Sequence, residues 1–272
     1  MRHIPFDPER DLSPEQRIWW DAWMARADAA RDDYVAKRLA GEDPPFRSEI
    51  WKELKDWLSE NVFFGKCAYC EFDMEAGFYG EAEHYRPKGN VTVPDDSGTK
   101  QRVTCTGGAE HPGYYWLAYD WRNLVPSCSK CNNTKSDQFP VKGAHAMPPA
   151  PDWKVLTEQE DPLLLHPYFD EIDKHIRFGK FGRIVAIDGD PHGVATIRTF
   201  GLDRTQLTEK RWERQDEVFA AMARELLESG LREEDVAKVK ERWIGKRTRF
   251  SAAVRAYYQL RYPDLVRALD VR

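Results

Sequence analysis

Apolar residues near the N-terminus recur at intervals of three and four, which is the spacing of one face of an α-helix. The repeat follows Ser13-Pro14-Glu15-Gln16, in which serine can cap a helix, proline suits its first position and glutamine completes a capping box. The pattern predicts a helix that runs to about Leu39 and ends before Gly41-Glu-Asp-Pro-Pro45. Its apolar face comprises Trp19, Trp23, Ala27, Ala30 and Tyr34.

A second helix is predicted from about Arg47 to Asn61, because its apolar residues again fall on one face. That face comprises Ile50, Trp51, Leu54, Trp57 and Leu58. The tryptophans of both helices are typical of a core, or of a surface that docks a partner protein, rather than of base stacking. They are Trp19, Trp20, Trp23, Trp51 and Trp57.

The C-terminal part changes from a strand pattern to helical patterns. His175-Ile-Arg-Phe178 and Arg183-Ile-Val-Ala-Ile187 flank Gly179-Lys-Phe-Gly182, which predicts a β-hairpin. A turn is predicted at residues 196–202, and the proline- and alanine-rich segment 144–152 is predicted to be a linker. Helices are predicted from about Gln206 to Ser229 with Gly230 after the end, from about Glu233 to Ile244, and from Phe250 to Arg261.

Cysteines supply the strongest chemical signal. Two short knuckles, Cys67-Ala-Tyr-Cys70 and Cys128-Ser-Lys-Cys131, have the spacing with which four thiolates hold one tetrahedral zinc ion. Zinc held by four cysteines has no open position, so it would stabilise the fold without activating water. Two disulfides are the disfavoured alternative, because Cys-x-x-Cys is a poor disulfide loop, and the fifth cysteine, Cys105, is expected to be incidental.

The segment between the knuckles carries the candidate catalytic groups. The sequence Glu81-Ala-Glu83-His84-Tyr-Arg-Pro87-Lys88 precedes Asn123, and the second knuckle continues into Asn132-Asn133-Thr134-Lys135. Over about residues 61–142 this order of motifs resembles the HNH endonuclease superfamily, whose zinc-bound members share these elements. The resemblance implies an α+β fold in which a two-stranded hairpin and one helix surround a catalytic metal, with mainly helical arms on both sides.

The resemblance also implies a role for each residue. His84 would act as general base, Glu83 and Asn132 would hold Mg²⁺ or Mn²⁺, and Asn123 would fix the loop behind His84. Arg86 and Lys135 would contact phosphate. The position of Glu83 usually holds Asp or His in this family, so its ligand role is the weakest assignment. The alternative role of Asn132 is that of a helix N-cap. The alternative for His84 is a structural role, because an isolated histidine is more often structural than catalytic. His166 and His175 are expected to be structural, and the remaining histidines carry no functional claim.

The chain has a longer connection between its knuckles than a plain zinc ribbon. We expect the polar, glycine-containing stretch from Asp95 to Gly113 to be a loop inserted between the strand with His84 and the strand with Asn123.

Charge bears on the nucleic-acid hypothesis. The net charge is −5 and the pI is about 5.9, whereas a protein that binds DNA alone usually has a basic face. The acidic balance therefore favours a local basic patch or a partner that supplies DNA affinity. Residues 238–261 are rich in Lys and Arg, and we expect Lys246, Arg247 and Arg249 to contact phosphate, although such runs are often only solvated. The absence of a long apolar run and the reduced cysteines favour a soluble cytoplasmic protein.

The flanking segments carry a softer resemblance, based on Asp161-Pro-Leu-Leu-Leu-His-Pro and on spaced apolar positions up to Arg211. They resemble the PtuB-like HNH nucleases of the Septu and retron anti-phage systems. That resemblance implies a DNA-cleaving effector that binds an ABC-type ATPase, since this sequence has no phosphate-binding loop of its own. A stand-alone restriction-like endonuclease and a non-catalytic zinc module that binds nucleic acid remain open. We expect an N-terminal arm at residues 1–60, a nuclease core at 61–143 and a C-terminal region at 153–272.

Overall fold

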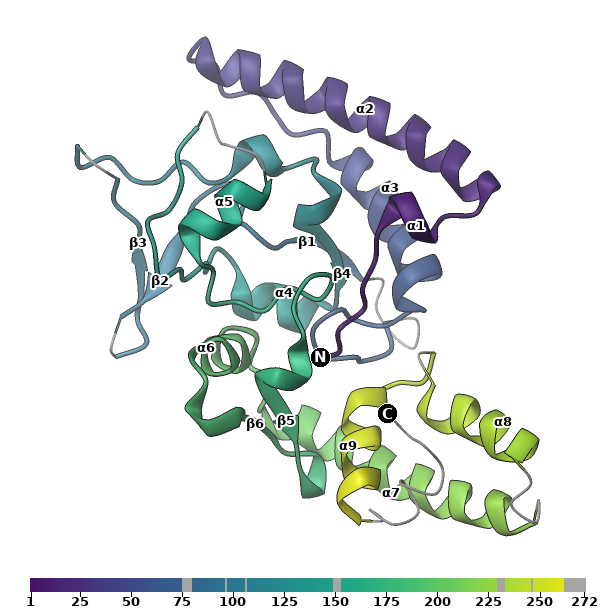
Figure 1. Cartoon of the computed structure of the whole chain (residues 1–272). Coiled ribbons are helices and arrows are strands. Elements are labelled where there is room, and N and C mark those ends of the chain that lie inside the picture. Colours follow the sequence, from purple (N-terminus) through teal and green to yellow (C-terminus); the bar gives the residue numbers. More distant parts are fainter. Residues whose placement is uncertain are drawn as a thin grey trace.

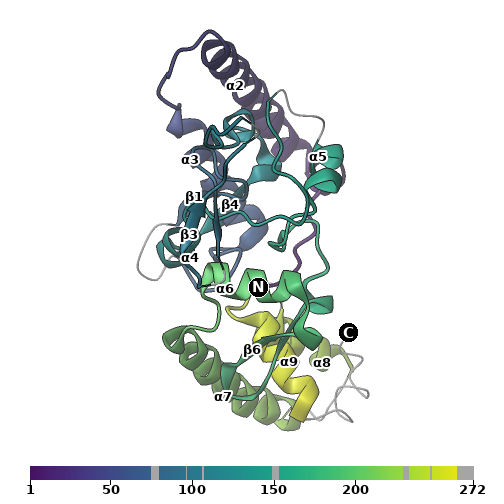
Figure 2. The same ribbon diagram turned by 90° about the vertical axis from the view of Figure 1, so that its left-hand side faces the viewer.

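The computed structural model describes residues 1–74, 80–95, 97–105, 107–148, 153–228, 233–245 and 247–261. The fold combines helices with small antiparallel sheets, as the sequence predicted for an α+β protein. Figures 1 and 2 show an elongated molecule, with the long N-terminal helix at one end and the C-terminal helices at the other. None of the described helices is both long enough and apolar enough to cross a membrane.

The helices are α1 (Pro8–Asp11), α2 (Pro14–Leu39), α3 (Ser48–Leu58), α4 (Ser129–Lys135), α5 (Trp153–Glu160), α6 (Pro191–Phe200), α7 (Thr205–Glu228), α8 (Glu233–Ile244) and α9 (Ser251–Arg261). The strands pair as β1 (Glu81–His84) with β4 (Leu124–Ser127), β2 (Thr92–Pro94) with β3 (Lys100–Arg102), and β5 (Ile176–Phe178) with β6 (Ile184–Ala186). Short single-turn helices complete the description at Ser59–Phe63 (π) and, as 3₁₀ turns, at Tyr115–Leu117, Trp121–Asn123, Ile172–Lys174, Lys180–Gly182 and Ile187–Gly189.

The N-terminal helix forms as predicted. Ser13 accepts a hydrogen bond from the backbone N–H of Gln16, and the Gln16 side chain accepts one from the backbone of Ser13, so the capping box is complete. The second helix, α3, packs against both β1 and β4. It therefore lies between α2 and the hairpin.

The tryptophans of α2 and α3 belong mainly to the core. Trp20, Trp23 and Trp51 are buried, and the Trp19 ring stacks on Trp57 with a centroid distance of 5.2 Å. The indole N–H of Trp23 donates to the carbonyl of Ile50 over 2.9 Å, which ties α2 to α3. The expectation that these rings cover a partner protein therefore loses most of its support, because the rings cover one another.

The β1–β4 hairpin brings together segments that are far apart in the sequence. The register pairs Glu81 with Ser127, Glu83 with Val125 and His84 with Leu124. Helix α4 follows β4 directly and faces β1 (Figure 1). The long connection between the strands is not only a loop, since it contains the β2–β3 hairpin.

The C-terminal region packs on the hairpin core through α6 and is closed by α7, α8 and α9. One apolar cluster runs from Met1 to Ala253, and a smaller one joins α7, α8 and α9. The predicted β5–β6 hairpin and the helices α7 to α9 are present. The turn predicted at residues 196–202 is wrong, because residues 191–200 form α6; Gly230 lies outside the described residues.

We predict that Trp20→Ala lowers the free energy of unfolding by about 3–5 kcal/mol, because it removes a buried ring from a close-packed cluster. The Trp20 ring lies 5.3–5.8 Å from the rings of Phe6, Trp57, Trp23 and Trp121, and the residue is 2% exposed. Urea denaturation measures the change. Ile18→Ala is the matched control, since Ile18 lies on the same helix but is 74% exposed and should change stability by less than about 0.5 kcal/mol. Equal effects of the two substitutions would contradict the packing described here.

Candidate functional site

The four knuckle cysteines converge on one point. Their sulfur atoms all lie within 4.8 Å of one another, and the Cys70 and Cys128 sulfurs are 3.7 Å apart. Sulfurs placed about 2.3 Å from one zinc ion at tetrahedral angles are about 3.8 Å apart. None of the four forms a disulfide. The cluster therefore has the donor set and the size of a four-thiolate zinc site.

Backbone contacts explain why the knuckles meet. The N–H of Ala68 donates to the carbonyl of Pro126 over 2.9 Å, so the first knuckle is attached to β4. Cys128 precedes the first residue of α4, and Cys131 lies in its first turn. The fifth cysteine, Cys105, is in the inserted connection, where its sulfur contacts that of Met147.

The surroundings of the cluster are cationic. Both terminal nitrogens of Arg204 lie 3.8 Å from the Cys131 sulfur. Arg211 is buried, and this burial lowers its pKa to about 10, while the negative charge of a Cys70 thiolate acts in the opposite direction. Zinc with four thiolates carries a net charge of −2, and these two guanidinium groups offset it. This electrostatic match is a further reason to assign a metal to the cysteines.

His84 ends β1 with its side chain buried. The Nε2 atom is 3.0 Å from the carbonyl oxygen of Ala118, and the ring makes an edge contact with Trp51 at 4.9 Å between centroids. A carbonyl can only accept a hydrogen bond, so Nε2 carries the proton and Nδ1 keeps its lone pair. Burial, and next the positive charge of Lys88, hold the pKa of His84 well below its usual value. The imidazole is therefore neutral at neutral pH.

Asn123 joins the two ends of the hairpin loop. Its Oδ1 accepts from the backbone N–H of Arg86 over 2.7 Å, and its Nδ2 donates to the carbonyls of Arg86 at 3.0 Å and Leu117 at 3.1 Å. The side chain is fully buried. Asn123 thus holds the segment that follows His84 and the segment that presents the Ala118 carbonyl to it.

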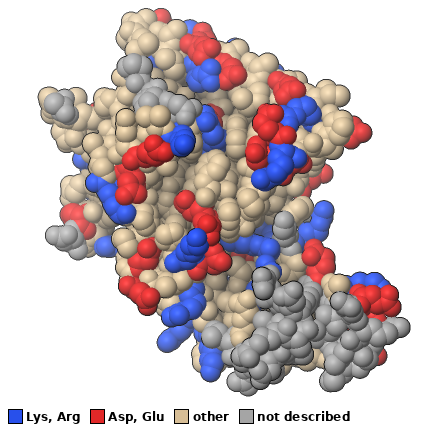
Figure 3. Space-filling model, in the orientation of Figure 1, with Lys and Arg blue, Asp and Glu red and all other residues tan. Residues whose placement is uncertain are grey.

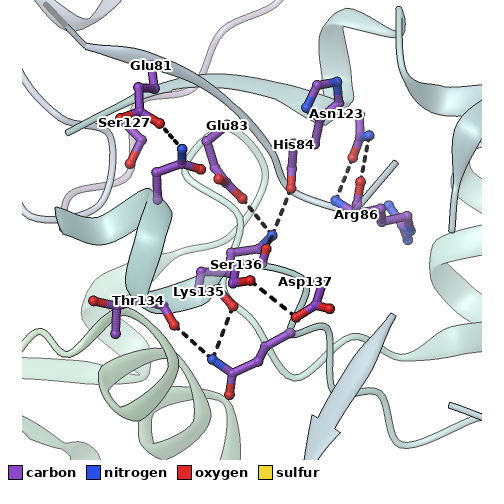
Figure 4. A network of polar contacts seen from close by, with 12 residues as sticks. Glu81, Glu83, His84, Arg86, Asn123, Ser127, Thr134, Lys135, Ser136 and Asp137 are labelled. Carbon is purple, nitrogen blue, oxygen red and sulfur yellow. Dashed lines mark hydrogen bonds and ion pairs between the residues drawn. The ribbon is translucent and has the colours of Figure 1, made fainter. Parts of the chain in front are cut away.

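Lys135 and Glu83 form a buried ion pair beneath β1. The Lys135 Nζ is 2.6 Å from the Glu83 Oε1 and donates to the carbonyl of His84 over 2.8 Å. Burial raises the pKa of Glu83, and the adjacent Lys135 counteracts this rise. Lys135 is 0% exposed. The predicted phosphate contact of Lys135 is therefore corrected to a structural role under the strand (Figure 4).

Arg86 requires the same correction. It is 0% exposed, and its Nε donates to the Glu160 Oε2 over 2.8 Å. The other Glu160 oxygen accepts from the Tyr114 hydroxyl at 2.5 Å. A guanidinium held in this way has no surface from which to reach phosphate, so Arg86 anchors the hairpin loop to α5.

Asn132 contacts a residue to which the sequence patterns gave no role. Its Nδ2 donates to the carboxylate of Glu81, and both residues are partly exposed. Glu81 and Glu83 lie two residues apart on β1 and so share the face that meets α4, as Figure 4 shows. Alternation along a strand is the signal that could have identified Glu81.

The structure does not gather the predicted catalytic residues into one cluster. The His84 side chain points away from those of Glu83 and Glu81, while Asn123 lies on the side of His84 (Figure 4). Lys88 is a second residue without an earlier assignment. It is partly exposed, lies 5.1 Å from the centre of the Trp51 ring, and its charge acts on both Glu83 and His84.

The predicted basic surface is only partly described. Lys246 lies outside the described residues, and Arg247 and Arg249 are exposed. Arg247 covers the Phe64 ring at 4.4 Å, and Arg249 is 3.9 Å from a Glu217 oxygen. Nearby, Arg242 pairs with Glu225 at 2.6 Å. Among the described residues on the face in Figure 3, basic and acidic side chains are interspersed and form no large basic patch.

The chain is similar to two curated proteins that share the name Septu. No family model matches the chain. It is 34% identical over 173 residues to the Septu protein PtuB of Bacillus mycoides (strain KBAB4), covering 62% of this chain and 54% of that protein. It is 30% identical over 160 residues to the Septu protein PtuA of the same strain, covering 58% of this chain and 20% of that protein. The chain thus matches about half of one relative and a fifth of the other.

We predict that Cys128→Ser removes one zinc ion per chain and lowers the melting temperature strongly, because metal binding of this kind is coupled to folding. Metal analysis by mass spectrometry and thermal denaturation give the two readouts. Cys105→Ser is the matched control and should change neither, since Cys105 is not in the cluster. Unchanged zinc content in Cys128→Ser would contradict the assignment.

Proposed function

We propose that this chain is a metal-dependent endonuclease that hydrolyses DNA phosphodiester bonds, with His84 as the general base. The observation that carries the proposal is a neutral, buried imidazole at the end of β1, with Nε2 directed at a backbone carbonyl. It lies in a hairpin-and-helix unit that the four cysteines join. The similarity to the Septu protein PtuB supports the same reading.

The proposed chemistry follows from the tautomer of His84. With the proton on Nε2, Nδ1 can take a proton from the water that attacks phosphorus, and the Ala118 carbonyl then stabilises the imidazolium. The edge contact with Trp51 and the hydrogen bonds of Asn123 keep the ring and its carbonyl partner in place. Removing such a base typically slows a reaction by about 10²- to 10⁴-fold.

The proposal places a divalent ion beside Asn132. Because Lys135 neutralises Glu83, we assign the oxygen ligands to Asn132 and Glu81 rather than to Asn132 and Glu83. Oxygen donors of this kind suit Mg²⁺ or Mn²⁺. When bound, such an ion would neutralise charge that develops on the phosphate and the leaving oxygen. Lys88, which is partly exposed near His84, replaces Arg86 and Lys135 as the candidate phosphate contact.

The proposed setting is an anti-phage complex of the Septu type with an ATPase partner. Its support is the similarity to two Septu proteins of one strain and the net charge of −5, which disfavours strong DNA binding by the isolated chain. Efficient cleavage by the isolated protein at physiological salt would instead favour a stand-alone nuclease of the same chemistry.

We predict that His84→Ala lowers the rate of plasmid cleavage in Mg²⁺ by at least about 10²-fold while DNA affinity stays within about 2-fold. A gel assay of nicking and a binding titration measure the two effects. His145→Ala is the matched control, because His145 also bonds a backbone carbonyl, that of Phe139, but lies outside the hairpin. Full cleavage by His84→Ala would overturn the catalytic assignment, and no cleavage by the wild type with its ATPase partner would favour a binding module.

The different roles proposed for Glu81 and Glu83, on one face of β1, can be distinguished by experiment. Glu81→Gln should lower cleavage with little loss of stability and be partly restored by high Mn²⁺, because it weakens a metal ligand. Glu83→Gln should lower the free energy of unfolding by about 3–5 kcal/mol, because it leaves the Lys135 ammonium buried without its counter-charge. Urea denaturation and a Mn²⁺ titration of cleavage distinguish the outcomes. If high Mn²⁺ restored cleavage by Glu83→Gln but not by Glu81→Gln, Glu83 rather than Glu81 would be the metal ligand.

A further inference from the structure

Two histidines and an aspartate meet outside the β1–β4 hairpin, between the β5 strand and the start of α6. His175 precedes β5, Asp190 is the N-cap of α6 and His192 lies in its first turn. One ligand atom from each lies within 4.8 Å of the other two. The close approach depends on Gly193, since a side-chain carbon there would come within 2.4 Å of the His175 carbonyl oxygen.

The distances centre on one carboxylate oxygen. The Asp190 Oδ1 accepts a hydrogen bond from the Nδ1 of His175 over 2.9 Å, which a metal ion would replace, and lies 3.8 Å from the Nδ1 of His192. Ligand atoms about 2.0–2.1 Å from a tetrahedral zinc ion are about 3.3 Å apart, so the observed values lie on either side of that separation. The three side chains are 20–26% exposed, which gives an ion access from solvent.

One atom in this group lacks a partner. The Nδ1 of His192 is buried and has no hydrogen-bond partner, although it faces the Asp190 oxygen at 3.8 Å. On the other side of the same ring, Nε2 accepts a hydrogen bond from the Lys142 ammonium over 3.3 Å and lies 3.7 Å from the Asp161 carboxylate. A metal ion on Nδ1 would move the ring proton to Nε2, which would then donate to Asp161 in place of accepting from Lys142. Metal-bound histidines commonly direct their second nitrogen at a carboxylate, which fixes the ring and increases its basicity.

Charge and space complete the site. A cavity of about 160 Å³ adjoins His175 and His192 and is lined on other sides by Asp161, Asp170 and His166. Among the described residues that line it there is no lysine or arginine. The Lys142 ammonium lies 3.3 Å from the His192 Nε2 and 3.0 Å from Asp161. The acidic surroundings favour a cation, and the cavity leaves room for water in an open position.

We propose that His175, Asp190 and His192 bind a second divalent transition-metal ion, zinc before others, that is separate from the four-cysteine centre. Two imidazoles and one carboxylate are a common ligand set for zinc, with water as the fourth ligand. The ion would join the β5 segment to the start of α6 and present its open position to the cavity. The proposal does not depend on nuclease activity.

The test is the zinc content of the full chain after incubation with excess ZnCl₂ and desalting. Wild type should hold two zinc ions per chain, and His175→Gln, His192→Gln and Asp190→Asn should hold one. Asp190→Asn is the sharpest variant, because Asn caps a helix as well as Asp and leaves α6 intact. His3→Gln is the matched control, since His3 contacts the Tyr168 carbonyl and is not in the group.

Affinity and spectroscopy separate this ion from the cysteine-bound one. Loss of a ligand should weaken binding of the second zinc ion by at least about 10- to 100-fold, the range seen when only an orienting partner is lost. Lys142→Met should strengthen binding, because it removes a competing cation. In Co²⁺-substituted protein, the thiolate charge-transfer band should persist in every variant of the triad. A single zinc ion in wild type, or a second zinc ion that Asp190→Asn binds as tightly, would overturn the proposal.

Discussion

The convergence of four sulfur atoms is the constraint on which the rest of the structure depends. It joins the turn after α3 to the start of α4, and β1 and β4 lie between these two points. Strands of four residues have little stability of their own. Because the first knuckle also hydrogen-bonds β4 through Ala68 and Pro126, the cluster helps to hold the short ladder from Glu81 to His84 in one register. The position of His84 is thus tied to the four-cysteine cluster.

A second layer of constraint consists of buried polar groups. Asn123, Arg86 with Glu160, and Lys135 with Glu83 all act on the few residues around His84. Each group would be costly to bury alone and is tolerable because its partner is present. The number of such contacts near one imidazole is typical of a functional site, where orientation matters more than stability.

Local sequence patterns predicted much of this architecture. The features that depend on contacts between distant residues could not be predicted from them. The capping box of α2, the apolar face of α3 and the cysteine spacing could be read directly. Helix α6 was missed, since β-branched Val194, Thr196, Ile197 and Thr199 lower its intrinsic helix preference and tertiary burial overrides it. The burial of Arg86 could not be predicted, because Glu160 lies 74 positions away and leaves no local pattern. The prediction that Arg86 and Lys135 contact phosphate assumed that a charged side chain is exposed to solvent. In the fold, both side chains are buried in ion pairs.

The paired charges under β1 also restrict how this protein can change over time. Glu83 and Lys135 come from different elements, yet each is neutralised by the other in a place that water does not reach. A protein in which only one of these two residues is substituted would fold poorly. Substitutions that persist in evolution should therefore change Glu83 and Lys135 together. Related proteins should therefore either keep both charges or have lost both, and a lineage that exchanged them for apolar residues would have a more stable but differently charged strand.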